Sequence, residues 1–256
     1  MEKTISRAII RRYMEKLEDH LELDVAIVGA GPCGMTAAKQ LVRNGFKTAI
    51  FERRLTPGGG IWGGGMCFNE IVLQEDLQDV MDDYGIRTRP AGEGLMTVDA
   101  VEMASALAFG CTNAGATIFN GITVEDIVFK EERVGGVVVN WSTVEMAKLM
   151  VDPLVFEARA VVDGTGHPSE VAEMAVRKAG VKLDTPTGGI VGEKPMWAES
   201  GERLTVEQTK RLYPGLYVSG MAAINVSGGY RMGPVFGGML RSGLKLANMI
   251  QKDLAT

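Results

Sequence analysis

The run LDVAIVGAGPCGMTAAKQLVRNGFKTAIFERR, residues 23–54, holds a short β-rich apolar segment, a glycine turn, an alanine-rich segment and a second β-rich segment. This order predicts a strand, a helix and a parallel strand that ends at Glu52, which together form a βαβ unit. Gly29, Gly31 and Gly34 fall between the first strand and the helix with the GxGxxG spacing of a dinucleotide-binding fingerprint. We therefore expect an α/β protein with a Rossmann-type fold that binds an adenine dinucleotide.

Each position of the fingerprint has a physical reason. The first glycine permits the tight turn, the second lets the backbone approach a pyrophosphate, and the third lets the helix pack closely on the strand. The N-terminus of the helix then stabilises the phosphate charge. Glu52 ends the second strand, where a carboxylate accepts hydrogen bonds from ribose hydroxyls and repels a 2′-phosphate. The pattern favours NAD or FAD over NADP, and it does not separate NAD from FAD.

The rest of the chain predicts a single dinucleotide-binding domain over residues 1–256, with an amino-terminal helix at about 4–20 and an inserted β/helix subdomain at about 60–160. Residues 53–69 are too rich in glycine for a helix or a central strand, and they predict a shaped loop. Further helices are predicted at 74–84, 98–114, 169–179 and 234–253, the last with Pro234 at its first position. Strands are predicted at 116–121, at 122–141 with a hairpin turn at Gly135 and Gly136, at 154–167 where the run ends in a glycine turn, and within 215–223, where a short strand ends at glycine.

Composition excludes several classes of protein. Lys and Arg total 27 against 32 Asp and Glu, a net charge of −5, so no basic surface for nucleic acid or anionic lipid is predicted. The longest apolar runs are far shorter than the roughly 20 residues of a membrane span, and no apolar signal-peptide core is present, so we expect a cytoplasmic protein. The three cysteines, Cys33, Cys67 and Cys111, are scattered and odd in number, which predicts free thiols.

Two sets of residues outside the fingerprint carry candidate chemistry. Asp152 and His167 stand at opposite ends of one predicted strand, and a carboxylate with an imidazole suits a divalent transition metal with open positions. The alternative is that Asp152 belongs to an Asp-Pro turn and that His167 caps the following helix. Arg231, within the glycine-rich SGGYRMGPVFGGM, is able to clamp a small carboxylate, or it is a surface residue near a helix start.

Four motifs together resemble the thiamine thiazole synthases of the Thi4 type, a family with a glutathione-reductase-like dinucleotide-binding fold. These motifs are DVAIVGAGPCGM, FERRLTPGGGIWGGGMCFNEIV, MVDPLVFEARAVVDGTGH and SGGYRMGPVFGGM, which extend from residue 24 to about 239. The two long glycine-rich motifs are far more specific than GxGxxG alone. The resemblance therefore covers nearly the whole chain.

The resemblance implies that NAD is a substrate and not a redox carrier. In this family nicotinamide is lost, the ADP-ribose remainder opens and isomerises to a ketose, glycine condenses with it as an imine, and sulfur addition with cyclisation gives an ADP-thiazole carboxylate. The residues that match nucleotide-holding positions of the family are Ala30, Glu52, Arg53, Gly60, Val124 and Met221. Asp152 and His167 match its iron(II) ligands, with the aspartate contributed across a subunit boundary, and Arg231 matches the residue that holds the glycine carboxylate. Relatives form octamers, which implies a homo-octamer here.

One departure from the family concerns the sulfur. Members that donate the sulfur of their own cysteine carry it two positions before the Asp-Pro pair, where this chain has Met150. A thioether cannot leave as sulfide by the β-elimination that a cysteine adduct undergoes, so we expect exogenous sulfide and multiple turnover. Sulfide-using relatives often carry histidine at this position, and Met150 departs from that pattern too.

Two other functions fit part of the sequence. An FAD-dependent oxidoreductase of the same fold would share the fingerprint and Glu52, although Met221 stands where FAD-binding relatives usually place an aspartate. A non-catalytic NAD-binding protein would keep NAD intact, whereas a synthase would release nicotinamide.

Overall fold

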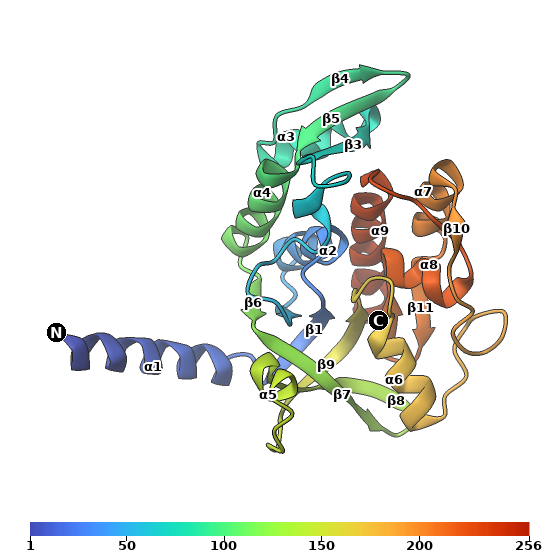
Figure 1. Cartoon of the computed structure of the whole chain (residues 1–256). Coiled ribbons are helices and arrows are strands. Elements are labelled where there is room, and N and C mark those ends of the chain that lie inside the picture. The colour runs from blue at the N-terminus through green and yellow to red at the C-terminus, as the bar shows by residue number, and fades with distance from the viewer. Residues whose placement is uncertain (256) are drawn as a thin grey trace.

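The computed structural model describes residues 1–255, which fold around a central sheet of eight strands (Figure 1). The strands of this sheet are β1 (Glu22–Val28), β2 (Thr48–Glu52), β6 (Thr117–Asn120), β7 (Ile122–Lys130), β8 (Arg133–Trp141), β9 (Leu154–Asp163), β11 (Lys210–Tyr213) and β12 (Leu216–Val218). Five of them run parallel in the order β12-β9-β1-β2-β6, with β11 antiparallel at one edge. The hairpin of β7 and β8 joins the sheet through β8, which pairs antiparallel with the start of β9. This parallel-dominated sheet confirms the predicted α/β class.

The predicted βαβ unit is confirmed. α2 (Pro32–Arg43) connects the parallel strands β1 and β2, and it begins with Pro32 at a position where no backbone N–H is needed. Gly45 follows the helix with a φ of +85°. α2 packs against α9 (Gly237–Leu254) so closely that a Cβ on Gly243 would lie 2.5 Å from the carbonyl oxygen of Cys33. The sheet and the last helix therefore hold the fingerprint helix between them.

A second, antiparallel sheet lies at the top of the molecule in Figure 1. Its strands are β3 (Glu70–Gln74), β4 (Arg89–Gly92) and β5 (Leu95–Asp99), in the order β3-β5-β4. α4 (Ala100–Asn113) leads from β5 back toward β6 and confirms the helix predicted at 98–114. Its N-cap, Asp99, accepts a hydrogen bond from the backbone N–H of Glu102 at 2.8 Å. The boundaries of an inserted subdomain stay a prediction, because β6 of the central sheet lies within 60–160.

Several predicted boundaries are wrong. The turn of the β7–β8 hairpin is formed by Glu131 and Glu132, both at positive φ, and not by Gly135 and Gly136, which lie inside β8. A Cβ on Gly136 would overlap the carbonyl oxygen of Phe156, so this glycine serves the close pairing of β8 with β9.

Two helix boundaries also differ from prediction. The helix predicted at 74–84 is α3 (Gln78–Tyr84), preceded by the 3-10 turn η2 (Glu75–Leu77). α9 starts at Gly237 and leaves Pro234 in the preceding loop, because the Glu202 carboxylate accepts the N–H of Gly238 at 2.6 Å. The short strand predicted within 215–223 is confirmed as β12, which ends at Val218 just before Gly220, and α8 (Met221–Ser227) follows.

The two larger parts of the core lie on opposite faces of the central sheet, and a small third cluster contains Met221, Ile224 and Met232. Val25 and Ile27 of β1 face the cluster that contains α2, α4 and α9, whereas Ala26 and Val28 face the other cluster. A parallel strand buried on both faces reads as a continuous apolar run, which is how β1 appears in the sequence. The second cluster includes residues of the β7–β8 hairpin and of α6 (Glu170–Ala179), the helix predicted at 169–179.

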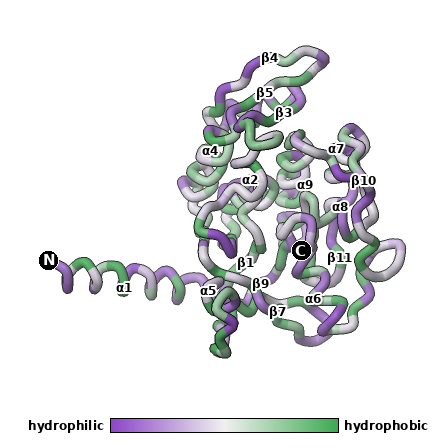
Figure 2. Tube along the Cα trace, viewed as in Figure 1, coloured by the Kyte–Doolittle hydropathy of each residue, from purple (hydrophilic) through white to green (hydrophobic). Residues whose placement is uncertain are grey.

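α1 (Glu2–Glu18) confirms the predicted amino-terminal helix, but it has no buried residue and extends away from the rest of the chain (Figure 1). Figure 2 shows apolar and polar residues alternating along it. Ile9 is 65% exposed and Ile10 is 60% exposed. None of the helices within residues 1–255 has the combined length and apolar character that crossing a membrane requires. The remaining elements are η1 (Ile61–Gly63), α5 (Ser142–Met146), β10 (Lys194–Met196), α7 (Ala198–Glu207) and β13 (Tyr230–Arg231).

An ion-pair cluster joins α2 to α3 and yields a pH-dependent prediction. Asp83 lies 2.8 Å from the buried Lys39 ammonium and 2.9 Å from Arg43, and the Arg43 hydrogen bonds lower the pKa of Asp83 from 3.8 to about 2. Because the native pKa lies below the unfolded one, this carboxylate stabilises the fold above about pH 4, and that contribution is lost as the pH falls toward 2.

We expect Asp83→Asn to lower Tm by roughly 2–4 °C at pH 7, since Lys39 keeps a buried charge without its carboxylate. The difference from wild type should shrink as the pH falls through 3.8 toward 2. Thermal unfolding followed by circular dichroism at several pH values measures both effects. Asp79→Asn, at an exposed position of the same helix, serves as the control. A Tm loss that does not depend on pH would contradict the assignment.

Candidate active site

A cavity of about 1100 Å³ opens at the carboxyl ends of the parallel strands β1, β2, β9 and β12. Ligands of open α/β sheets bind at this edge. The predicted site residues that line the cavity are Gly29, Gly31, Glu52, Arg53, Gly60, Val124, His167, Met221 and Arg231. Ala30 and Gly34 lie behind its wall, and Asp152 lies elsewhere.

The three fingerprint glycines differ in what surrounds them. A Cβ on Gly29, whose φ is +102°, would overlap the carbonyl oxygen of Gly164, and a Cβ on Gly34 would lie 2.5 Å from the carbonyl oxygen of Gly29. Apart from Gly31 and its neighbours in the chain, no residue from 1 to 255 has an atom within 4 Å of the Gly31 Cβ position. Gly29 and Gly34 therefore serve packing within the protein, whereas Gly31 borders open cavity beside the N-terminus of α2, where a pyrophosphate would approach.

Glu52 holds the fingerprint turn against the end of β2. Its carboxylate accepts hydrogen bonds from the backbone N–H of Ala30 at 2.8 Å and of Arg54 at 2.9 Å, and the residue is only 8% exposed. A carboxylate has about four lone-pair positions, so two such bonds leave capacity for ribose hydroxyls. The next residue, Arg53, pairs with Glu170 at the start of α6 at 2.7 Å.

The glycine-rich segment 53–69 forms the predicted loop, with the 3-10 turn η1 in its middle. The Trp62 indole N–H donates to the carbonyl oxygen of Pro57 at 2.7 Å, which closes the loop on itself. Gly59, Gly60 and the segment from Gly64 to Met66 line the cavity. Without side chains, this backbone forms a wall that a bound molecule can approach closely.

A buried carboxylate shapes the turn that carries His167. Asp163, at the end of β9, accepts hydrogen bonds from the N–H of Thr165 at 3.0 Å, from the Thr165 hydroxyl at 2.7 Å and from the N–H of Ala172 at 2.9 Å. The Thr165 hydroxyl in turn accepts the N–H of Glu170 at 2.8 Å, so His167 does not cap α6 and that alternative is wrong. The imidazole reaches the cavity, where its Nδ1 lies 2.6 Å from Glu193 Oε2.

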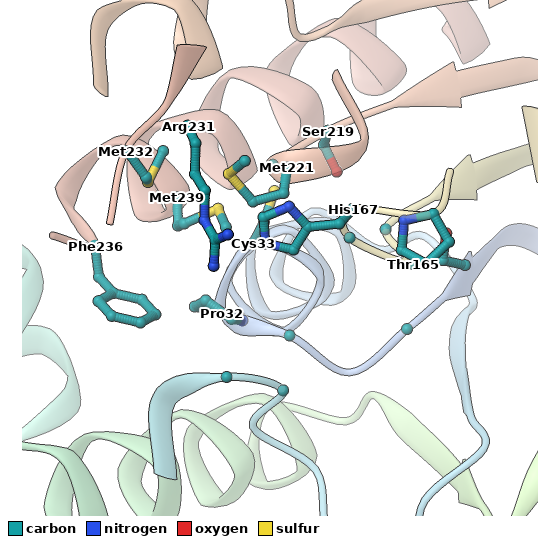
Figure 3. A pocket seen from close by; sticks show the side chains of 18 of the residues that line it. Pro32, Cys33, Thr165, His167, Ser219, Met221, Arg231, Met232, Phe236 and Met239 are labelled. Atoms are coloured by element: carbon teal, nitrogen blue, oxygen red, sulfur yellow. The ribbon is translucent and has the colours of Figure 1, made fainter. Parts of the chain in front are cut away.

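Arg231 extends from β13 into the same cavity as the His167 imidazole (Figure 3). Its side chain makes no hydrogen bond or ion pair with any residue from 1 to 255, whereas its backbone carbonyl accepts the Trp197 N–H at 3.0 Å. The fixed backbone and free guanidinium suit a clamp for a small carboxylate. Arg231 is also exposed and lies six residues before the first residue of α9, so the clamp stays a prediction beside the alternative of a surface residue.

Asp152 does not reach this cavity in its own chain. It follows α5 and borders a separate cavity of about 140 Å³, together with Tyr13, Phe119 and Trp141. No group of three or more His, Cys, Asp or Glu side chains able to hold a metal occurs among residues 1–255. Of the two predicted metal ligands, His167 alone lies at the cavity of its own chain. An imidazole together with a carboxylate from another chain is a donor set that suits iron(II).

The described cysteines are all free, as predicted. Burial raises the pKa of the Cys33 thiol, which lies in the wall of the cavity, and it raises the pKa of Cys111 to about 12. Both thiols are therefore poor nucleophiles. Cys67 is exposed, on the glycine-rich loop.

A sequence model of the Thi4 family matches residues 6–236. The chain belongs to the Thi4 family. The thiamine thiazole synthase of Methanothermobacter thermautotrophicus is 51% identical over 250 residues, which cover 98% of this chain and 97% of that protein. The thiamine thiazole synthase of Pyrococcus horikoshii is also 51% identical, over 253 residues, 99% of this chain and 98% of its own length. The crystal structure of Thermovibrio ammonificans THI4 is similar, with a TM-score of 0.98 and 53% identity, and the match covers 100% of this chain and 99% of that one.

Glu193 is a residue of this Thi4 cavity that the sequence did not single out. It follows the glycine-rich segment 188–192, in a part of the chain for which no element was predicted. A glycine-rich run that ends in an acidic residue is a weak signal of a loop placed near a ligand. Its contact with His167 depends on tertiary structure, which no local pattern indicates.

The fingerprint glycines give a matched pair of variants. We expect Gly31→Ala to fold with near-wild-type stability but to bind NAD at least tenfold more weakly, because its methyl group would occupy the space that the pyrophosphate approaches. Gly34→Ala should instead lose roughly 1–3 kcal/mol of stability through overlap with Gly29. Thermal unfolding and calorimetric titration with NAD separate the two effects. Unchanged NAD affinity in Gly31→Ala would refute this placement of the pyrophosphate.

Proposed function

We propose that this Thi4 chain is a thiamine thiazole synthase that makes ADP-thiazole carboxylate from NAD, glycine and exogenous sulfide, with iron(II) as its metal. The observation that carries the proposal is the joint presence of the fingerprint loop, His167 and Arg231 in one cavity. Such a cavity can hold a dinucleotide and a small carboxylate next to a metal-binding imidazole. Membership of the family and the names of the relatives support the same activity.

Binding of the dinucleotide is the first step of the proposed reaction. In this proposal the pyrophosphate lies beside Gly31 at the N-terminus of α2, and the adenosine ribose donates to Glu52. Arg53, Gly60, Val124 and Met221 complete the nucleotide site. After nicotinamide leaves, the ribose remainder faces the end of the cavity that His167 and Arg231 border, which is where glycine must join it.

Arg231 binds the glycine carboxylate through two charge-assisted hydrogen bonds. A planar guanidinium fixes the orientation of a carboxylate, which a lysine ammonium does not. The freedom of the Arg231 side chain from protein partners supports this role. The amine of a glycine bound in this way is then able to condense with the ketose.

Iron(II) would be held by His167 of one chain and Asp152 of another. When bound, the metal supplies a Lewis acid with open coordination positions for the sulfur chemistry. The proposal explains why Asp152 borders a different cavity of its own chain. It requires at least a dimer, and we propose a homo-octamer.

The surroundings of Asp152 support contact with another chain. An exposed apolar surface is formed by Met146, Leu149, Met150, Val151, Leu154 and Val155. Met150 in particular is fully exposed. Contiguous exposed apolar residues mark interaction sites, so this surface is a suitable place for a second copy to dock.

A mixing experiment tests the shared site. We expect Asp152→Ala and His167→Ala to fold, to bind NAD and to lose iron(II) and thiazole synthesis. Co-expressed in equal amounts, the two variants should recover about a quarter of the wild-type sites, because a random oligomer pairs an intact His167 with an intact Asp152 that often. Anaerobic metal analysis and product assay measure this. Activity in either single variant, or no recovery in the mixture, would refute the arrangement.

The source of sulfur has its own test. We expect product to exceed enzyme when the protein is incubated anaerobically with NAD, glycine, iron(II) and sulfide, and the intact mass of the chain to stay unchanged, because Met150 cannot donate its sulfur. Mass spectrometry of the chain also examines the exposed Cys67. Conversion of any cysteine to dehydroalanine, with product limited to one per chain, would eliminate the sulfide proposal.

A further inference from the structure

The hydrogen bond between His167 and Glu193 determines which ring nitrogen is available. Glu193 Oε2 lies 2.6 Å from His167 Nδ1 at the exposed border of the cavity. An ionised carboxylate only accepts hydrogen bonds, so Nδ1 carries the proton and donates it. In the neutral imidazole this leaves Nε2 with a free lone pair.

Asn225 forms hydrogen bonds with the segment that carries Glu193 and with the turn that follows His167. Its Oδ1 accepts the backbone N–H of Glu193 at 3.2 Å, and its Nδ2 donates to Ser169 Oγ at 3.1 Å. The hydrogen bonds lead from His167 to Glu193, from Glu193 to Asn225 and from Asn225 to Ser169. Ser169 follows His167 by two residues, so the chain itself closes the ring. Main-chain bonds extend it, since the N–H of Gly192 donates to the carbonyl oxygen of Asn225 at 2.9 Å.

One member of the ring, Ser169, is held in a strained backbone conformation. Ser169 is fully buried with a φ of +49°, a conformation that residues other than glycine seldom adopt. Its hydroxyl, which accepts from Asn225, donates to the carbonyl oxygen of Ala222 at 3.2 Å, which ties the turn after His167 to α8. A strained residue persists only where its surroundings fix it, and strained residues cluster at functional sites.

We propose that Glu193 is a positioning residue that fixes His167 as its Nδ1–H tautomer and presents Nε2 to the cavity, and that Asn225 positions Glu193. A ligating histidine commonly donates its other ring N–H to a carboxylate, which sets its tautomer and orientation. The identity of the metal at Nε2 rests on the proposed function, whereas the tautomer rests on the geometry alone. In this proposal Glu193 acts on the metal site through His167 and is not itself a ligand.

The first test observes the tautomer without metal. The chain has two histidines, so a ¹⁵N-histidine NMR spectrum is simple, and His167→Asn assigns the signals. In alkaline buffer we expect a protonated Nδ1 and an unprotonated Nε2 for wild type and Glu193→Gln, since an amide oxygen also accepts from Nδ1–H. In Glu193→Ala the proton should move mainly to Nε2. An Nε2–H tautomer in wild type, or no change in Glu193→Ala, overturns the proposal.

The second test measures metal affinity by anaerobic titration of the whole protein with Co(II) as an iron(II) probe. We expect Glu193→Ala to lose about 10- to 100-fold in affinity, Asn225→Ala to lose less, and Glu193→Gln to stay within a few-fold of wild type. Glu199→Ala, at an exposed position of α7, is the matched control, and NAD binding reports on the integrity of the cavity.

The outcomes separate the two proposals. Equal affinity in wild type and Glu193→Ala overturns the positioning role, and a loss in Glu193→Gln as large as in Glu193→Ala makes Glu193 a ligand and overturns it too. Absence of metal binding in wild type, with the Nδ1–H tautomer observed, instead overturns the iron site of the proposed function and leaves the tautomer assignment supported.

Discussion

The close contact between two glycine turns determines where this site forms. The turn after β1 carries the fingerprint, the turn after β9 leads to His167, and the two meet where a Cβ on Gly29 would overlap the carbonyl oxygen of Gly164. The N–H of Gly164 donates to the carbonyl oxygen of Val28 at 2.9 Å, so the contact continues the pairing of the two strands. A nucleotide that approaches the first turn is therefore brought to the second. Larger residues at either turn would separate the fingerprint loop from the imidazole.

The parts of the fold that were predictable are those encoded by neighbours in the chain. The unit from β1 to β2 carries a strand pattern, a glycine turn and a helix stop within residues 23–54, and each of these is a local signal. The hairpin turn was misplaced for the opposite reason. Gly136 is needed where β8 approaches Phe156 of β9, a contact across the sheet, and not where the chain reverses at Glu131 and Glu132. Glycine marks both situations, and sequence does not distinguish them.

The site shows the same division. Gly29, Gly31 and Glu52 follow from the fingerprint, and the motifs that carry the family resemblance identify His167 and Arg231. Glu193 was out of reach because its partner His167 is 26 residues away and its support, Asn225, is a further 32 residues along the chain. For Asp152 only the family resemblance implied a contribution across a subunit boundary, because its place outside the cavity of its own chain follows from the course of the β7–β8 hairpin and α5.

Glu52 links ligand choice to the shape of the fingerprint turn. Its carboxylate borders the cavity and also accepts the N–H groups of Ala30 and Arg54, of which Ala30 is fully buried. Replacing it to admit a coenzyme phosphorylated on the ribose would leave the buried N–H of Ala30 without an acceptor, at a cost of about 1–3 kcal/mol. In the proposed function, the two oxygen atoms that would discriminate between coenzymes are thus the ones that stabilise the turn. Redesign of this protein toward the phosphorylated coenzyme would have to begin with a new acceptor for the turn, and only then alter the charge.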